Sequence, residues 1–202
     1  MSAFASRITA LDVALLLPPE SVAELTRLNA RLSSPSEGFQ FDSGHLPHVT
    51  LAQQFVLNSE INVICNKLKH LANQYAPIRL CCSGLVASGA TTSLRITESE
   101  QLFELHERIM NTLEAHVTQP GDAQAFFHGS ETARHADIAW VNNFRNHSSG
   151  CRFEPHITVG KGTLDSQHTA LIFSTSTLAA CHLGRFCTCR HVFDSWSLTK
   201  TP

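Results

Sequence analysis

A chain of 202 residues with 43% apolar residues is long enough to bury a substantial core, so we expect it to fold by itself. Its formal net charge of -2 excludes the strongly basic surface by which proteins bind long nucleic acids, because that binding neutralises many phosphates. The seven cysteines are an odd number without an export signal, which favours the cytoplasm, or the nucleus, over a disulfide framework.

The first half of the chain predicts alternating strands and helices. Residues 11–17 form a short apolar run that ends at two prolines, and this run is too short to span a membrane, so we expect a buried strand. Apolar residues at helical spacing over 22–32 predict a helix. After a turn-rich stretch, the alternation over 48–56 predicts a second strand.

The middle of the chain repeats this arrangement. An apolar stripe over 61–71 predicts a helix that must stop before Pro77. Two short strands, 78–86 and 92–96, are expected on either side of a Ser-Gly-Ala turn, and a stripe over 102–113 predicts another long helix.

The last third is harder to interpret. Residues 121–150 are polar and rich in His, Asn and Ser, which is typical of a lid or a loop. Strands are expected from His156, over 178–183 and over 190–198, whereas 163–173 has no clear pattern. The order of elements predicts an α+β fold of two similar lobes, and a single bilobal domain over residues 1–202.

Two matching pentapeptides stand at the start of predicted strands: Pro-His-Val-Thr-Leu at 47–51 and Pro-His-Ile-Thr-Val at 155–159. The tripeptide His-x-Ser/Thr occurs five times, so by itself it is no evidence for a site. On a strand, however, alternate side chains share a face, so His48 lies beside Thr50 and His156 beside Thr158. His116 and Thr118 end a helix, where residues two apart diverge, and are not expected in a site.

Two imidazoles and two hydroxyls that face one cleft suit chemistry at a phosphodiester. The histidine pKa of about 6.5 lets one imidazole accept a proton while the other donates one near neutral pH. The hydroxyls of Thr50 and Thr158 could donate hydrogen bonds to the phosphoryl oxygens. We therefore expect His48 and His156 to be catalytic, Thr50 and Thr158 to bind phosphate, and neither a metal nor a cofactor to be needed.

The chain resembles the two-histidine phosphoesterase superfamily, which includes RNA 2',3'-cyclic phosphodiesterases and 2'-5' RNA ligases. The resemblance lies in His-Val-Thr-Leu-Ala-Gln at 48–53, His-Ile-Thr-Val-Gly at 156–160, His-Leu-Gly-Arg-Phe at 182–186 and the strand over 193–198. It implies two mainly antiparallel sheets that face a central cleft, with helices on the outside. It also implies that each sheet contributes one His and one Thr to a bound phosphate. The segments 121–150 and 163–173 match no pattern of the family.

The leading hypothesis is a monomeric hydrolase that opens a 2',3'-cyclic nucleotide or the 2',3'-cyclic phosphate end of a short RNA, without a membrane partner. Three alternatives stay open. The same residues could hydrolyse linear 2'-5' or 3'-terminal linkages of short RNA, or the protein could bind phosphate or RNA ends without turnover. A zinc module is the most distant, because Cys187, Cys189 and His191 offer three ligands where structural zinc usually has four.

A few further residues could contact a substrate. Trp140 could stack on a base, although core packing is the simpler expectation for it. His45 lies three residues before His48, where a solvated position is expected. Three cations bracket the second motif and could hold phosphates, although solvation is the simpler expectation for each: Arg145, Arg152 and Lys161.

Overall fold

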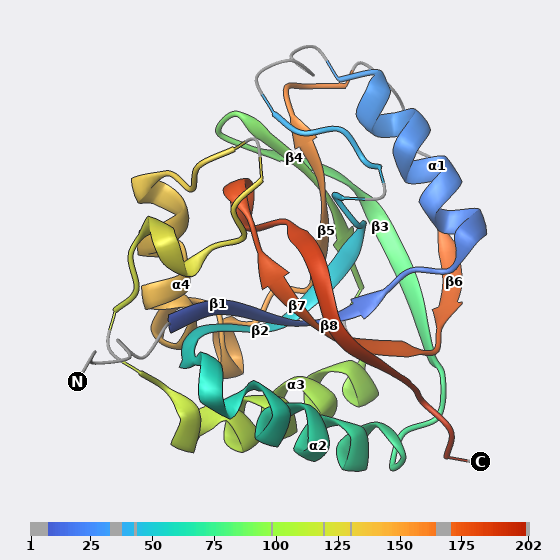
Figure 1. Cartoon of the computed structure of the whole chain (residues 1–202). Coiled ribbons are helices and arrows are strands. Elements are labelled where there is room, and N and C mark those ends of the chain that lie inside the picture. The colour runs from blue at the N-terminus through green and yellow to red at the C-terminus, as the bar shows by residue number, and fades with distance from the viewer. Residues whose placement is uncertain are drawn as a thin grey trace.

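Two four-stranded antiparallel sheets form the centre of the protein (Figure 1). The computed structural model describes residues 8–32, 38–42, 44–97, 99–118, 120–129, 131–164 and 171–200. The strands are β1 (Ile8–Leu16), β2 (His48–Leu57), β3 (Ile78–Ser88), β4 (Thr91–Ile96), β5 (His156–Lys161), β6 (Ile172–Thr175), β7 (Thr177–Leu183) and β8 (Cys189–Ser197).

The two sheets have the orders β2-β1-β7-β8 and β5-β4-β3-β6. The two strands that carry the His-x-Thr motifs, β2 and β5, are therefore edge strands, one in each sheet, and they contact each other. This arrangement confirms the predicted α+β class with two mainly antiparallel sheets.

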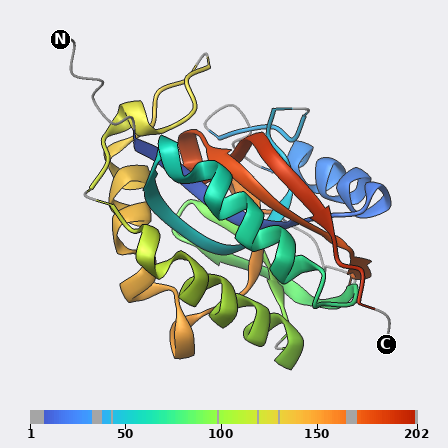
Figure 2. The same ribbon diagram turned by 60° about the horizontal axis from the view of Figure 1, so that its bottom comes forward.

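The main helices are α1 (Pro19–Ala30), α2 (Ile61–Ala72), α3 (Glu100–Leu113) and α4 (His135–His147). Helices α2 and α3 lie side by side over the first sheet, as the two views show (Figures 1 and 2). Helix α3 also contacts β2, and α1 packs on β5 at the other sheet. Each motif strand is thus backed by a helix.

One continuous hydrophobic core joins the two sheets and the helices that cover them. It includes the inward residues of both motif strands: Val49, Leu51, Ile157 and Val159, all of which are fully buried. The alternation that predicted the strands therefore reflects burial on one face of each sheet. Within the described part of the chain, no helix is long and apolar enough to span a membrane.

The expectation of a lid or loop over 121–150 was wrong, because this segment contains α4. Its apolar residues Ile138, Val141 and Phe144 recur at helical spacing, but only Val141 and Phe144 are buried, so polar neighbours obscure the stripe. The helix begins where the carboxylate of Asp137 accepts a hydrogen bond from the Arg134 backbone N–H at 2.8 Å. The unclear segment 163–173 leads into β6, and residues 165–170 of it lie outside the described residues.

Candidate active site

The four motif side chains occupy equivalent positions on β2 and β5. His48 and Thr50 are partly exposed on one face of β2, and His156 and Thr158 are partly exposed on one face of β5. Because β2 and β5 are neighbouring edge strands of the two sheets, the structure brings the two motif strands together from opposite halves of the chain.

Each motif strand has a β-bulge at the same position, directly after the motif threonine. In the β1–β2 pair, Thr50 and Ala52 are partnered by adjacent residues, so Leu51 is the extra residue. In the β4–β5 pair, Thr158 and Gly160 are partnered by adjacent residues, so Val159 is extra. A bulge bends its strand and turns the neighbouring side chains, and bulges are common beside active sites. The two halves of the chain therefore share a β-bulge as well as the His-x-Thr tripeptide.

A buried helix side chain holds the carbonyl of each bulge residue. Nδ1 of His106, on α3, donates to the Leu51 carbonyl at 2.6 Å, and Nδ2 of Asn29, on α1, donates to the Val159 carbonyl at 2.7 Å. A bulge leaves a backbone group without its ladder partner, and a buried group of that kind needs another partner. His106 and Asn29 provide it, and sequence periodicity did not indicate either residue.

The close approach of α1 to β5 requires glycine at position 160. Gly160 has a φ of 146°, and a Cβ there would lie 2.7 Å from Nδ2 of Asn29 and 2.7 Å from Cδ1 of Leu32. We expect Gly160→Ala to lower the free energy of unfolding by about 2 kcal/mol, through backbone strain and overpacking. Urea denaturation measures this. Gly84→Ala is the matched control, because Gly84 has a φ of 144° with no atom near the added Cβ. Equal losses at both positions would contradict the role of the helix contact.

The two motif imidazoles are oriented in the same way. Nδ1 of His48 lies 2.7 Å from the Leu46 carbonyl, and Nδ1 of His156 lies 2.8 Å from the Glu154 carbonyl. A carbonyl only accepts hydrogen bonds, so Nδ1 is the protonated donor in both rings and Nε2 is the atom left for other chemistry.

The surroundings of the two Nε2 atoms differ. Nε2 of His48 lies 3.4 Å from Oδ2 of Asp12, and the Thr50 hydroxyl donates to the same oxygen at 3.1 Å. Within the described residues, neither Nε2 of His156 nor the hydroxyl of Thr158 has a hydrogen-bond partner. The His48 and Thr50 side chains of the first motif therefore contact a carboxylate, whereas the corresponding side-chain atoms of the second motif have no such contact within the described residues.

Asp12 also changes the acidity of His48. Burial lowers the pKa of this imidazole, but the hydrogen bond and charge of Asp12, together with the Leu46 carbonyl, outweigh burial and raise the pKa above the ordinary value of 6.5. His48 thus favours the protonated form.

A chain of hydrogen bonds extends from Asp12 to the surface. Nε2 of Gln53 donates to Oδ2 of Asp12 at 3.0 Å, and the indole N–H of Trp140 donates to Oε1 of Gln53 at 2.9 Å. Because an indole N–H only donates, it fixes which end of the Gln53 amide faces Asp12. Trp140 is 45% exposed, so the expectation of core packing for it was wrong. Helix α4 places this ring at the surface beside the first motif strand.

The other polar residues singled out in the sequence have structural contacts. His45 is buried rather than solvated, with its two ring nitrogens each 3.2 Å from a carboxylate, those of Asp42 and Glu131. The Arg145 guanidinium donates to the Met110 carbonyl at 2.9 Å, which ties α4 to α3. Lys161 lies beside the ring of Phe186, and Arg152 is exposed. His116 pairs with Glu60, and its part of the chain lies outside the motif strands.

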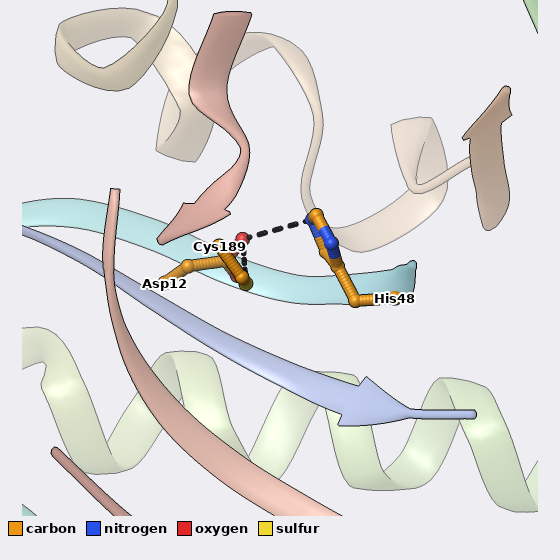
Figure 3. A group of neighbouring side chains, drawn as sticks. All are labelled: Asp12, His48 and Cys189. Carbon is orange, nitrogen blue, oxygen red and sulfur yellow. Dashed lines mark hydrogen bonds and ion pairs between the residues drawn. The ribbon is translucent and has the colours of Figure 1, made fainter. Parts of the chain in front are cut away.

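The three potential zinc ligands of the sequence do not converge. Cys187 lies in a 3-10 turn before β8 and donates to the Asp137 carbonyl, whereas the ring of His191 stacks beside Phe127. In the described part of the chain, the group with metal-ligand spacing is instead Asp12, His48 and Cys189 (Figure 3).

That group is a hydrogen-bonded cluster. Burial, with the neighbouring Cys181 and Asp12, raises the pKa of the Cys189 thiol well above its usual range. A metal ligand would have to be the thiolate, whereas here the thiol donates to Oδ2 of Asp12 at 3.6 Å. A metal would also occupy Nε2 of His48, so metal binding and proton transfer at this atom exclude each other.

Comparisons with known proteins identify the family and the fold. A family model described as the 2'-5' RNA ligase superfamily matches residues 17–180. Among solved structures, TT0787 of Thermus thermophilus is 16% identical, with a TM-score of 0.61 over 96% of this chain and 100% of that chain. E. coli LigT in its apo form is also 16% identical, with a TM-score of 0.60 and the same coverage. At these identities the likeness shows the fold alone. No curated protein matches the sequence.

Proposed function

Because the chain belongs to the 2'-5' RNA ligase superfamily of two-histidine phosphoesterases, a membership that supports phosphodiesterase-type activity, we propose that it hydrolyses a cyclic phosphodiester. The proposed substrate is a 2',3'-cyclic nucleotide or the 2',3'-cyclic phosphate end of a short RNA. The observation that carries the proposal is the matched pair of His-x-Thr strands, with the same bulge and the same imidazole orientation in both sheets.

The proposed reaction uses these groups for two proton transfers. One imidazole takes a proton from water, whose oxygen forms a new bond to phosphorus. The bond from phosphorus to the 2' or 3' oxygen of the ring breaks, and the other imidazole protonates that oxygen. The product is a ribose with one phosphomonoester and one free hydroxyl. The Thr158 hydroxyl can donate to a non-bridging oxygen, and Thr50 can do so once its bond to Asp12 opens.

Solved structures of this fold support a small nucleotide as the ligand. E. coli LigT has solved structures in complex with phosphate, 3'-AMP, ATP and NADP+. The net charge of -2 of our chain also suits a short substrate better than a long polymer.

Product analysis on defined substrates tests the proposal. We expect the protein to open 2',3'-cyclic nucleotides and RNA with a 2',3'-cyclic end to a single monophosphate isomer, in excess EDTA. Linear 2'-5' dinucleotides are the comparison substrates. Cleavage of the linear substrates alone would replace the proposal with the linear-linkage alternative, and calorimetric binding without any product would make the protein a non-catalytic binder.

The exposed ring of Trp140 is proposed to stack on the substrate base. It stands at the end of the hydrogen-bond chain that leads through Gln53 to the first motif. We expect Trp140→Ala to raise KM for a cyclic nucleotide about tenfold, because stacking one base on an aromatic ring contributes about 1–3 kcal/mol. Steady-state kinetics measure this.

Trp140→Phe keeps a ring and removes the N–H that orients Gln53, so KM should change much less than in the alanine variant. A ribose 2',3'-cyclic phosphate that lacks a base is the control substrate. If Trp140→Ala raises KM equally on this substrate, Trp140 orients Gln53 and does not bind a base.

A further inference from the structure

Asp12 is a buried carboxylate in the middle of a mostly apolar strand. It lies on β1 with no exposed surface, and its neighbours Leu11 and Val13 pack in the core. Burying a charge is costly unless the charge is paired and hydrogen-bonded. The contacts of Asp12 therefore indicate why a carboxylate stands there.

Those contacts all converge on one oxygen, Oδ2, and three of them come from the first motif strand. The atoms are Nε2 of His48 at 3.4 Å, the Thr50 hydroxyl at 3.1 Å, Nε2 of Gln53 at 3.0 Å and the Cys189 thiol at 3.6 Å. Figure 3 shows the His48 imidazole and the Cys189 thiol, both in contact with the Asp12 carboxylate. An ionised carboxylate only accepts hydrogen bonds, so its partners are held as donors.

The hydrogen-bond partners of His48 define its protonation. Nδ1 faces the Leu46 carbonyl and Nε2 faces the Asp12 carboxylate, and both of these groups only accept. The ring satisfies both when each nitrogen carries a proton. His156 differs, because its Nδ1 faces a carbonyl while its Nε2 has no carboxylate beside it in the described residues.

We propose that Asp12 is a positioning residue that keeps the proton on Nε2 of His48, so that His48 is the general acid and His156 the general base. This rests on the proposed cyclic phosphodiesterase activity. In the reaction, Nε2 of His156 takes the proton of the attacking water, and Nε2 of His48 gives its proton to the leaving ribose oxygen. Asp12 stays ionised and touches no substrate atom.

The charges around His48 agree with this assignment. The hydrogen bond and charge of Asp12 raise the pKa of His48, which favours the protonated form that an acid needs. In the described residues, the titratable groups that interact with the ring or its carboxylate are Asp12 on β1, Cys189 on β8 and Cys187 in the turn before β8, with Cys181 on β7 behind the Cys189 thiol. Burial raises the pKa of Cys189, so that the thiol adds no second negative charge at neutral pH.

The pH–rate profile of Asp12→Asn tests the assignment. Loss of the acid's proton sets the alkaline limb of the profile, so removing the carboxylate should move that limb to lower pH and leave the acidic limb in place. A shift of the acidic limb instead would make His48 the base. If neither limb moves, Asp12 is only structural. Both of these results overturn the proposal.

Asp137→Asn is the matched control, since Asp137 is also a buried carboxylate but pairs with Arg134. This variant should lower the unfolding temperature and move neither limb. A limb shift as large as that of Asp12→Asn would show that the pH–rate profile responds to a general loss of stability and not to the Asp12–His48 contact. This result would overturn the proposal.

NMR titration of the His48 ring provides a readout that needs no substrate. At neutral pH the wild-type ring should carry a proton on both nitrogens, and in Asp12→Asn its titration midpoint should fall. Absence of cyclic phosphodiesterase activity would reject the proposed function while this measurement still decides the role of Asp12. If Asp12→Asn does not fold, a neutral ring in the wild-type spectrum overturns the proposal. Stoichiometric zinc in untreated wild-type protein, absent from Cys189→Ser, would overturn it as well.

Discussion

Replacement of either motif histidine, His48→Ala or His156→Ala, is expected to lower kcat for a 2',3'-cyclic nucleotide by about 10³-fold, because each imidazole carries one of the two proton transfers. KM should change little, since a proton transfer is made in the transition state and not on binding. The double variant should be only slightly slower than either single variant, because residues that act as a unit are not additive. Steady-state kinetics on the three purified variants measure this.

His147→Ala is the matched control for these variants. His147 also begins a His-x-Ser tripeptide, but it is exposed in the last turn of α4 and should retain wild-type kinetics. Wild-type turnover by the double variant would rule out the proposed chemistry, and a comparable loss in His147→Ala would show that the assay does not report on the motifs.

The second large effect is expected at His106, which joins the first motif strand to the segment that precedes β5. Its ring donates through Nδ1 to the Leu51 carbonyl, accepts through Nε2 from the Gly150 N–H at 3.2 Å, and stacks on Phe153 at 3.8 Å between ring centroids. His106→Ala leaves the buried Leu51 carbonyl and the partly buried Gly150 N–H without partners and opens a cavity. We expect the free energy of unfolding to fall by about 3 kcal/mol, measured by urea denaturation.

The pH dependence of stability provides a second readout of His106. Burial lowers the pKa of this imidazole below the value of 6.5 in the unfolded chain. The unfolded chain then binds the proton first, so stability should decrease as pH falls below about 6.5 towards the folded pKa. His106→Ala should remove this contribution to the slope. His70→Ala, at an exposed position of α2, should change stability by less than about 0.5 kcal/mol. Equal stability of the His106 and His70 variants would contradict the proposed stabilisation by the hydrogen bonds and stacking of His106.

Most of the fold could be predicted from the sequence, because burial on one face leaves a periodic record in the strands and helices. The strands that carry the motifs, β2 and β5, begin where alternation predicted them. Helix α4 was missed because only two of its apolar residues are buried, and because its polar surface dominates the composition of 121–150. Trp140 was misjudged for a related reason, since residue type favours the core while the helix turns this ring outwards.

The surroundings of the motifs could not be predicted, because they depend on contacts between distant parts of the chain. Asp12 lies 36 residues before His48, and Asn29 contacts β5 from 130 residues away. The one available signal was the charge of Asp12 inside the apolar run of residues 11–17. His106 carried no signal, since periodicity does not distinguish one helical histidine among the twelve in the chain.

Turnover of a 2',3'-cyclic nucleotide in excess EDTA, followed across pH with the wild-type protein, tests the central claim most directly. Two histidines that divide proton transfer between them predict hydrolysis to one monophosphate isomer without added metal, with a bell-shaped profile of kcat/KM. Hydrolysis that requires a divalent metal, or no hydrolysis under conditions where the nucleotide is bound, would contradict it.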